Sequence, residues 1–129
     1  MTTTPNTRPL RVLIVEDHFA VADSLRMFLE NSGFEIVGMA GTLAAATALV
    51  ERGGFDIAVL DIRLGSANIA PVADRVAADG VPIVFLTGYS EADILPEPLR
   101  GYPRLSKPCD PGVLAATLRR LIDPESSVS

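Results

Sequence analysis

Residues 10–17 read Leu-Arg-Val-Leu-Ile-Val-Glu-Asp, a short apolar run that ends in two acids. Branched and apolar side chains with little alternation are typical of a strand that is buried on both faces, as in a parallel sheet. The stretch 56–61, Asp-Ile-Ala-Val-Leu-Asp, follows the same pattern and also ends in a carboxylate. Both stretches therefore predict buried strands with acidic side chains at their carboxyl ends.

Strand and helix patterns alternate along the rest of the chain. Strands are predicted over 10–15, 35–40, 56–60, 81–86 and 103–106, and helices over 18–31, 42–52, 71–78 and 111–122. Thr42 and Asp110 are placed as N-caps, and residues 62–70 as a loop. Because 88–101 contains Pro96, Pro98 and Gly101, we expect at most a short or irregular fourth helix there. This order predicts an α/β fold with helices on both faces of a parallel sheet.

The composition indicates a single folded domain. The chain has 129 residues, of which 48% are hydrophobic and 21% are charged, so a packed core is expected. We expect a disordered lead at residues 1–9, a folded domain at 10–122 and a polar tail at 123–129.

Charge and residue counts exclude several classes of function. A net charge of −5 argues against binding to nucleic-acid phosphates. One cysteine and one histidine exclude an internal disulfide and a multi-cysteine zinc site, and disfavour a Ser-His-Asp triad. No apolar run approaches the roughly 20 residues that cross a bilayer, and the first nine residues lack a signal-peptide pattern. We therefore expect a cytoplasmic protein that binds neither membrane nor nucleic acid.

Polar residues stand at the ends of four predicted strands. Glu16 and Asp17 follow the first, Asp61 ends the third, Thr87 ends the fourth, and Lys107 follows the fifth. Ligands of such sheets bind outside the carboxyl ends of the strands, so these side chains are expected at one edge. Three carboxylates brought together repel one another unless a cation intervenes. A hard divalent cation with oxygen ligands, such as Mg²⁺, would resolve that repulsion.

These residue types suit the transfer of a phosphoryl group onto a carboxylate. Asp61 is the candidate nucleophile, because an ionised carboxylate can attack phosphorus to form an acyl phosphate. Lys107 and Thr87 offer a positive charge and a hydroxyl to the other phosphoryl oxygens. Taken singly, each residue also has a structural interpretation, since Asp17 could cap the first helix. The occurrence of all five at one edge favours the chemical interpretation.

The chain resembles the response-regulator receiver domains of bacterial two-component signalling. The resemblance runs from about Leu10 to Ile122 and rests on Glu16-Asp17, Asp61, Thr87 and Lys107-Pro108, in that order. It implies a flavodoxin-like, doubly wound, five-stranded parallel sheet in the order 2-1-3-4-5. It also implies a cis peptide bond before Pro108.

The resemblance further implies the roles of the site residues. Asp61 would accept a phosphoryl group from a sensor histidine kinase or a histidine phosphotransfer protein, and Thr87 and Lys107 would bind that group. Asp17, Asp61 and the backbone carbonyl of Arg63 would ligate Mg²⁺, with Glu16 acting through metal-bound water. Such a protein is no enzyme in the usual sense. It catalyses its own phosphorylation, loses the phosphoryl group slowly, and signals through a downstream partner or a phosphorelay.

The segment Phe85-Leu86-Thr87-Gly88-Tyr89 resembles a Phe-x-Thr-Gly-Tyr segment of stand-alone receivers, mainly from alphaproteobacteria. About seven residues follow the last predicted helix, so a stand-alone receiver is the expectation.

Arg104 departs from the family pattern, in which an aromatic switch residue stands three places before the lysine. Tyr89 or Tyr102 could replace that aromatic, and the sequence does not choose between them. The alternative is a phosphorylation-independent, receiver-like interaction module. His18 lies next to the acidic pair, where a phosphohistidine or a metal ligand is the alternative, but it is interpreted as an exposed residue in the first turn of a helix. Cys109 is interpreted as inert.

Overall fold

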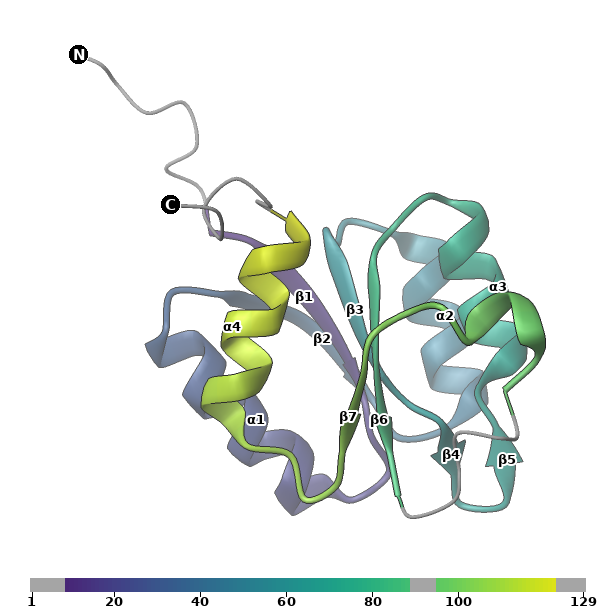
Figure 1. Ribbon diagram of the computed structural model, residues 1–129, viewed down its shortest axis with the longest axis horizontal. Helices are drawn as coiled ribbons and strands as arrows, with labels where there is room; N and C mark the ends of the chain where they lie inside the picture. The colour runs from purple at the N-terminus through teal and green to yellow at the C-terminus, as the bar shows by residue number, and fades with distance from the viewer. Residues whose placement is uncertain (1–8, 89–94, 123–129) are drawn as a thin grey trace.

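A computed structural model of the chain describes residues 9–88 and 95–122. The tail at 123–129, most of the lead at 1–9, and Tyr89 therefore lie outside the described residues. The strands of the main sheet are β1 (Arg11–Val15), β2 (Glu35–Ala40), β3 (Ile57–Asp61), β6 (Ile83–Thr87) and β7 (Arg104–Ser106). They pair in parallel in the order β2-β1-β3-β6-β7 (Figure 1). In chain order this is 2-1-3-4-5, so the predicted flavodoxin-like sheet is confirmed.

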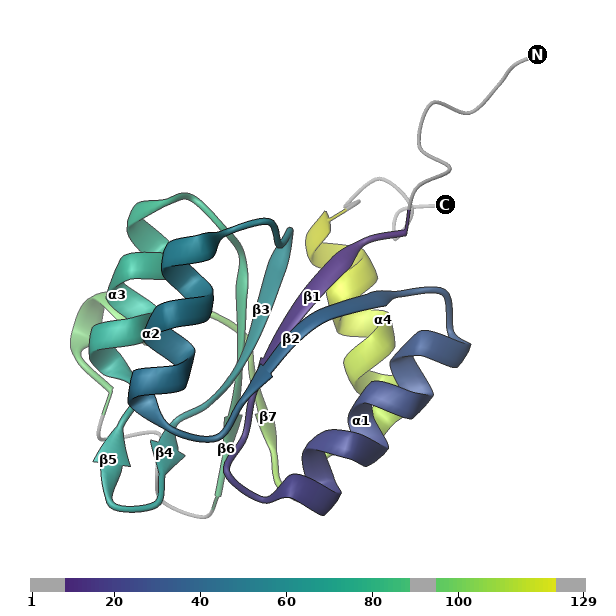
Figure 2. The same ribbon diagram turned by 180° about the vertical axis from the view of Figure 1, so that it is seen from behind.

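Helices cover both faces of the sheet. The helices are α1 (Phe19–Asn31), α2 (Leu43–Arg52), α3 (Ala70–Ala78) and α4 (Pro111–Ile122). Figures 1 and 2 show α1 and α4 on one face and α2 and α3 on the other. None of the helices in the described ranges is long and apolar enough to cross a membrane.

Burial on both faces explains the unbroken apolar strands. In β3, Ala58 and Leu60 belong to the core under α2 and α3, whereas Ile57 and Val59 belong to the core under α1 and α4. All five residues of β3 are buried, including Asp61 at its end. A strand that packs on both sides has no solvent face, so its pattern does not alternate.

Two predicted helix caps are confirmed, whereas the alternative role of Asp17 as a cap of the first helix is wrong. The Thr42 hydroxyl accepts a hydrogen bond from the Ala45 amide at 3.1 Å, and Asp110 Oδ1 accepts one from the Gly112 amide at 2.8 Å. Asp17 does not cap α1, whose N-cap residue is His18 with no capping side-chain hydrogen bond. Asp17 Oδ2 instead accepts a hydrogen bond from the Gly65 amide at 2.8 Å, because the carboxylate turns toward the loop after β3.

The loop predicted over residues 62–70 contains a small antiparallel pair, β4 (Arg63–Leu64) and β5 (Ala67–Asn68). Gly65 forms the turn with φ +58°, a backbone conformation that favours glycine. Strands of two residues have no periodicity, so the sequence pattern could not reveal them. The turn positions the Gly65 amide that holds Asp17.

In place of a regular helix before β7, the described residues contain a single 3₁₀ turn at Glu97–Leu99. Leu95 and Leu99 are both buried in the core under α2 and α3. The expected short or irregular fourth helix is therefore confirmed for 95–101, while 89–94 lie outside the described residues.

Removing the α2 cap should lower the free energy of unfolding. We expect Thr42→Ala to cost about 1 kcal/mol, since the Ala45 amide loses its hydrogen-bond acceptor. Thr47→Ala on the same helix is the matched control, and it should change stability by less than about 0.5 kcal/mol because Thr47 is exposed. Urea unfolding of both variants measures the difference. Equal losses would show that the cap is not the cause.

Candidate functional site

The predicted site residues meet at the carboxyl edge of the sheet. Asp61 ends β3 and Thr87 ends β6, while Glu16 and Lys107 directly follow β1 and β7. The register places Val15 opposite Leu60 and Asp61 opposite Leu86, so the neighbouring strands end at nearly the same height. The Lys107 amide donates to the Thr87 carbonyl oxygen at 2.9 Å, which extends this edge by one residue.

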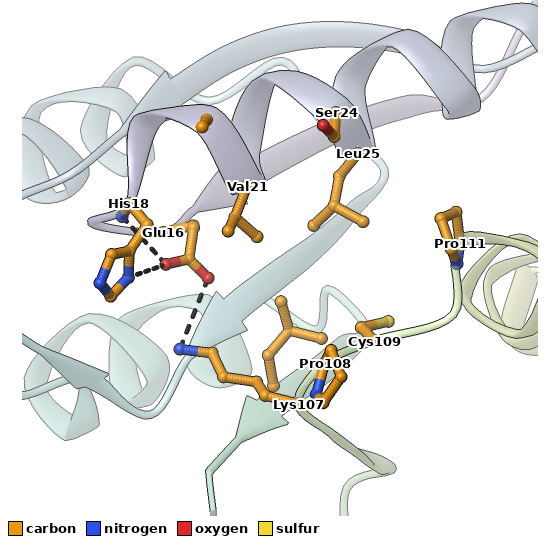
Figure 3. A pocket seen from close by; sticks show the side chains of 11 residues that line it. Glu16, His18, Val21, Ser24, Leu25, Lys107, Pro108, Cys109 and Pro111 are labelled. Atoms are coloured by element: carbon orange, nitrogen blue, oxygen red, sulfur yellow. Dashed lines mark hydrogen bonds and ion pairs between the residues drawn. The ribbon is translucent and has the colours of Figure 1, made fainter.

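Lys107 bridges two buried carboxylates. Its Nζ lies 2.8 Å from Asp61 Oδ2 and 3.6 Å from Glu16 Oε1, and both acidic side chains are 0% exposed. Figure 3 shows the lysine reaching toward Glu16 from the chain segment that leads to Pro108. The peptide bond between Lys107 and Pro108 is cis, as expected. One cation is thus shared between two carboxylates from different strands.

This environment changes the acidity of Asp61. Burial is the main reason that the pKa of Asp61 rises to about 6, and the negative charge of Glu16 adds to the effect. The hydrogen bond and charge of Lys107 and the Arg63 amide, 3.4 Å from Asp61 Oδ1, act in the opposite direction. The protein therefore stabilises the ionised form of Asp61 less well than water does.

Asp17 has the opposite tendency. Its partial burial disfavours the charged form, but the hydrogen bond from the Gly65 amide and the positive charge of His18 favour that form, and the pKa of Asp17 is lowered. Asp17 is therefore ionised at neutral pH, at the mouth of a site that already holds Glu16 and Asp61.

Two carboxylate oxygens make the site suitable for a divalent cation. Glu16 Oε1 and Asp17 Oδ1 are buried, yet neither accepts a hydrogen bond from the described residues. A buried polar atom without such a partner is costly, and anionic oxygens are the ligands that Mg²⁺ prefers. Glu16, Asp17 and Asp61 thus fit the predicted magnesium site. Arg63 lies in β4 with an exposed side chain, and the role of its carbonyl stays a prediction.

Thr87 is at the expected edge but is engaged with the main chain. Thr87 is buried, and its hydroxyl donates a hydrogen bond to the Gly88 carbonyl oxygen at 3.0 Å. Contact with a phosphoryl group would require the hydroxyl to give up this bond.

His18 contacts the acidic pair, which the sequence analysis missed. Its side chain is 70% exposed, as expected, but Nδ1 lies 3.1 Å from Glu16 Oε2 and 3.2 Å from Asp17 Oδ1. The His18 amide also donates to Glu16 Oε2 at 3.0 Å. The available signal was the position of His18 at the turn from β1 to α1, where its ring can fold back over the preceding acids.

A cavity of about 620 Å³ adjoins these residues, between α1 and the segment after β7. Figure 3 shows Val21 and Leu25 on the α1 side, opposite Pro108 and Cys109. Burial raises the pKa of the Cys109 thiol, which agrees with the prediction that this cysteine is inert.

The position of the usual switch aromatic is exposed. Arg104 lies at the start of β7 with an exposed side chain. The Tyr102 ring is half-buried and packs edge to face against Phe85, with 6.3 Å between ring centroids and an interplanar angle of 81°. Tyr102 is thus a packing residue here, and Tyr89 lies outside the described residues.

The raised pKa of Asp61 predicts a pH dependence of stability in metal-free protein. Between about pH 4 and 6 the folded state keeps a proton on Asp61 that the unfolded chain has lost. Since the folded state then binds more protons, the contribution of Asp61 to the free energy of unfolding should fall as pH rises. Urea unfolding with a chelator present measures this slope. Asp61→Asn should remove it, and the surface control Asp23→Asn should keep it. An unchanged slope in Asp61→Asn contradicts the assignment.

Comparison with known proteins places this site in a family. Residues 12–119 match the response regulator receiver domain. AlgB of Pseudomonas syringae, an alginate biosynthesis transcriptional regulatory protein, is 34% identical over 116 residues, or 86% of this chain. PdtaR of Mycobacterium tuberculosis, a transcriptional regulatory protein, is 34% identical over 67% of this chain. The chain spans only 26% of AlgB and 43% of PdtaR.

A solved structure covers nearly the same length. The solution structure of SdrG from Sphingomonas melonis is 40% identical, with a TM-score of 0.76 over 89% of this chain and 98% of SdrG. A BeF3-activated conformation of SdrG matches with a TM-score of 0.71 over 87% of this chain and 95% of that chain, again at 40% identity. With its fold, its acidic edge and its bridging lysine, the chain belongs to the response regulator receiver domains of two-component signalling.

Proposed function

We propose that this chain is a Mg²⁺-dependent phosphoryl acceptor that carries the phosphoryl group on Asp61. The observation that supports the proposal best is the bridge from Lys107 to Asp61 and Glu16. This lysine lies 2.8 Å from a fully buried carboxylate at the end of a strand. It offers a positive charge where a phosphoryl group on Asp61 would bring negative charge.

The donor is a phosphohistidine of a sensor histidine kinase or a histidine phosphotransfer protein. An Asp61 carboxylate oxygen attacks phosphorus, the phosphorus–nitrogen bond breaks with its electron pair staying on the imidazole, and an acyl phosphate forms. Lys107 offsets the added charge, and Thr87 gives up its bond to the Gly88 carbonyl to donate to a phosphoryl oxygen.

Mg²⁺, held by Asp17, Asp61 and the carbonyl of Arg63 with Glu16 nearby, would neutralise charge on the carboxylates and the phosphoryl oxygens. The unsatisfied oxygens of Glu16 and Asp17 support this assignment. Asp17 is fixed by the Gly65 amide, so one of its oxygens is already oriented.

The protein would act as a carrier rather than as an enzyme with turnover, in the cytoplasm, by binding a downstream protein or relaying the phosphoryl group. One observation favours a second candidate, an interaction module that works without phosphorylation. Arg104 is exposed and Tyr102 is packed against Phe85, so neither forms the usual aromatic switch.

Phosphorylation separates the two candidates. Incubation with acetyl phosphate and Mg²⁺ should add one phosphoryl group to the intact mass of the wild type. Asp61→Asn should show no gain, because it lacks the nucleophilic carboxylate oxygen. The control Asp56→Asn, which changes the residue directly before β3, should gain the phosphoryl group normally. No gain in folded wild type, with acetyl phosphate and with a phosphorylated histidine donor, would sink the acceptor proposal.

Magnesium should stabilise the folded state. At a concentration ten times its dissociation constant, a ligand specific to the folded state adds about 1.4 kcal/mol to the free energy of unfolding. Asp17→Asn should lose this gain, since it removes an anionic oxygen from the site. Asp23→Asn, which alters a carboxylate paired with Arg26 on α1, should keep it. Thermal unfolding with Mg²⁺ or chelator tests the difference, and equal gains in both variants contradict the site.

A further inference from the structure

We propose that the backbone amide of Gly65 is a selectivity determinant of the acidic edge, favouring Mg²⁺ over the larger Ca²⁺. The amide holds one oxygen of Asp17, so this carboxylate has a single oxygen left for a metal. Gly65 is a positioning residue in this role, because it acts through Asp17 and not on the cation itself. The inference rests on the Mg²⁺ site of the proposed function and adds the basis of its selectivity.

Both carboxylates that are proposed to ligate Mg²⁺ directly have one oxygen engaged by the protein. The Gly65 amide donates to Asp17 Oδ2 at 2.8 Å. The Lys107 ammonium group donates to Asp61 Oδ2 at the same distance. Asp17 Oδ1 is buried and accepts no hydrogen bond from the described residues. Asp61 Oδ1 faces the Arg63 amide at the longer distance of 3.4 Å. Each carboxylate therefore presents one oxygen to a cation.

Glu16 does not offer a free pair of oxygens either. Its Oε2 accepts a hydrogen bond from the His18 amide at 3.0 Å. Its Oε1 lies 3.6 Å from the positive charge of Lys107 Nζ. The acidic edge thus presents single oxygens from different carboxylates, and neither Glu16 nor Asp17 has both of its oxygens open.

The turn that carries the Gly65 amide is anchored in the core. Gly65 has φ +58° between β4 and β5, and the preceding residue, Leu64, is buried. At the base of this hairpin, the Ile69 amide donates to the Ile62 carbonyl oxygen at 2.9 Å, and both residues are fully buried. Because the turn is fixed on both sides, the amide holds Asp17 in one orientation.

Ca²⁺ and Mg²⁺ place different demands on a carboxylate. Ca²⁺ takes about six to eight oxygen ligands and often binds both oxygens of one carboxylate. Mg²⁺ requires near-octahedral geometry, keeps several waters and is satisfied by single carboxylate oxygens. A carboxylate with one oxygen already engaged therefore suits Mg²⁺ better. Without the Gly65 amide, Asp17 could turn and offer both oxygens to Ca²⁺.

The test removes only the N–H of Gly65. Replacing Gly65 with glycolic acid in the full chain puts an ester where the amide is, and NMR titration gives the dissociation constants of Mg²⁺ and Ca²⁺. The wild type should bind Mg²⁺ more tightly than Ca²⁺. The ester should weaken Mg²⁺ binding by roughly tenfold, the usual effect of losing a group that holds a metal ligand. It should leave Ca²⁺ binding within about twofold, since the released oxygen can join the larger shell.

Gly65→Ala is the matched control, because it keeps the N–H. An added Cβ meets nothing within 4 Å, although the positive φ costs stability. Its preference for Mg²⁺ over Ca²⁺ should equal that of the wild type. A purely structural role of Gly65 predicts that the ester loses affinity for both cations equally, and that result overturns the proposal. A wild type that does not prefer Mg²⁺ to Ca²⁺ also overturns it.

Amide hydrogen exchange of Gly65 in the wild type gives a reading that needs no variant. With Mg²⁺ bound, this amide should exchange no faster than without it, because the hydrogen bond to Asp17 Oδ2 persists. Faster exchange overturns the proposal, and this result decides alone if the ester protein fails to fold.

Acetyl phosphate separates this inference from the proposed function. A wild type that shows the Mg²⁺ preference and the ester effect, but gains no phosphoryl group from any donor, supports the selectivity and contradicts the acceptor role. Normal phosphorylation of Asp61 without a preference between the two cations gives the opposite conclusion.

Discussion

The ammonium group of Lys107 lies between two fully buried carboxylates, and the order of the strands keeps it there. Glu16 and Asp61 lie on adjacent strands, while Lys107 arrives from the far edge of the sheet beyond β6. Parallel pairing brings all three to the same edge, since every strand runs in the same direction. A single antiparallel strand would send its polar end to the opposite edge.

One lysine cannot neutralise the three carboxylates at this edge of the sheet. It faces Glu16 and Asp61 together, Asp17 lies beside them, and two carboxylate oxygens accept no hydrogen bond from the part of the chain that the structure describes. Buried unsatisfied charge lowers stability, and natural proteins tolerate it where a ligand supplies the missing partner. Burial and the charge of Glu16 raise the pKa of Asp61, and the two unsatisfied oxygens make this edge suitable for a cation.

The sequence predicts the strands and their polar ends because burial on both faces leaves a clear apolar signature, as in β3. It does not predict which way a side chain turns at a strand end. Asp17 could cap α1 or face the next loop, and the outcome depends on the Gly65 amide in a turn between two strands too short to show a pattern. The contact of His18 with Glu16 was missed for the same reason, since it depends on a rotamer at a turn.

Under the proposed function, the first structural consequence of phosphorylation lies at Gly88. The Thr87 hydroxyl donates to the Gly88 carbonyl oxygen, so it must leave that atom before it can donate to a phosphoryl oxygen. Tyr102 packs edge to face on Phe85, two residues before Thr87, and Arg104 pairs with Phe85 in the sheet. A change that begins at Thr87 therefore reaches the main chain at Gly88 directly. It reaches β7 and Lys107 through the backbone, by the pairing of Thr87 with Ser106 and by the hydrogen bond from the Lys107 amide to the Thr87 carbonyl oxygen. These backbone contacts of Thr87 do not involve the side chain at position 104.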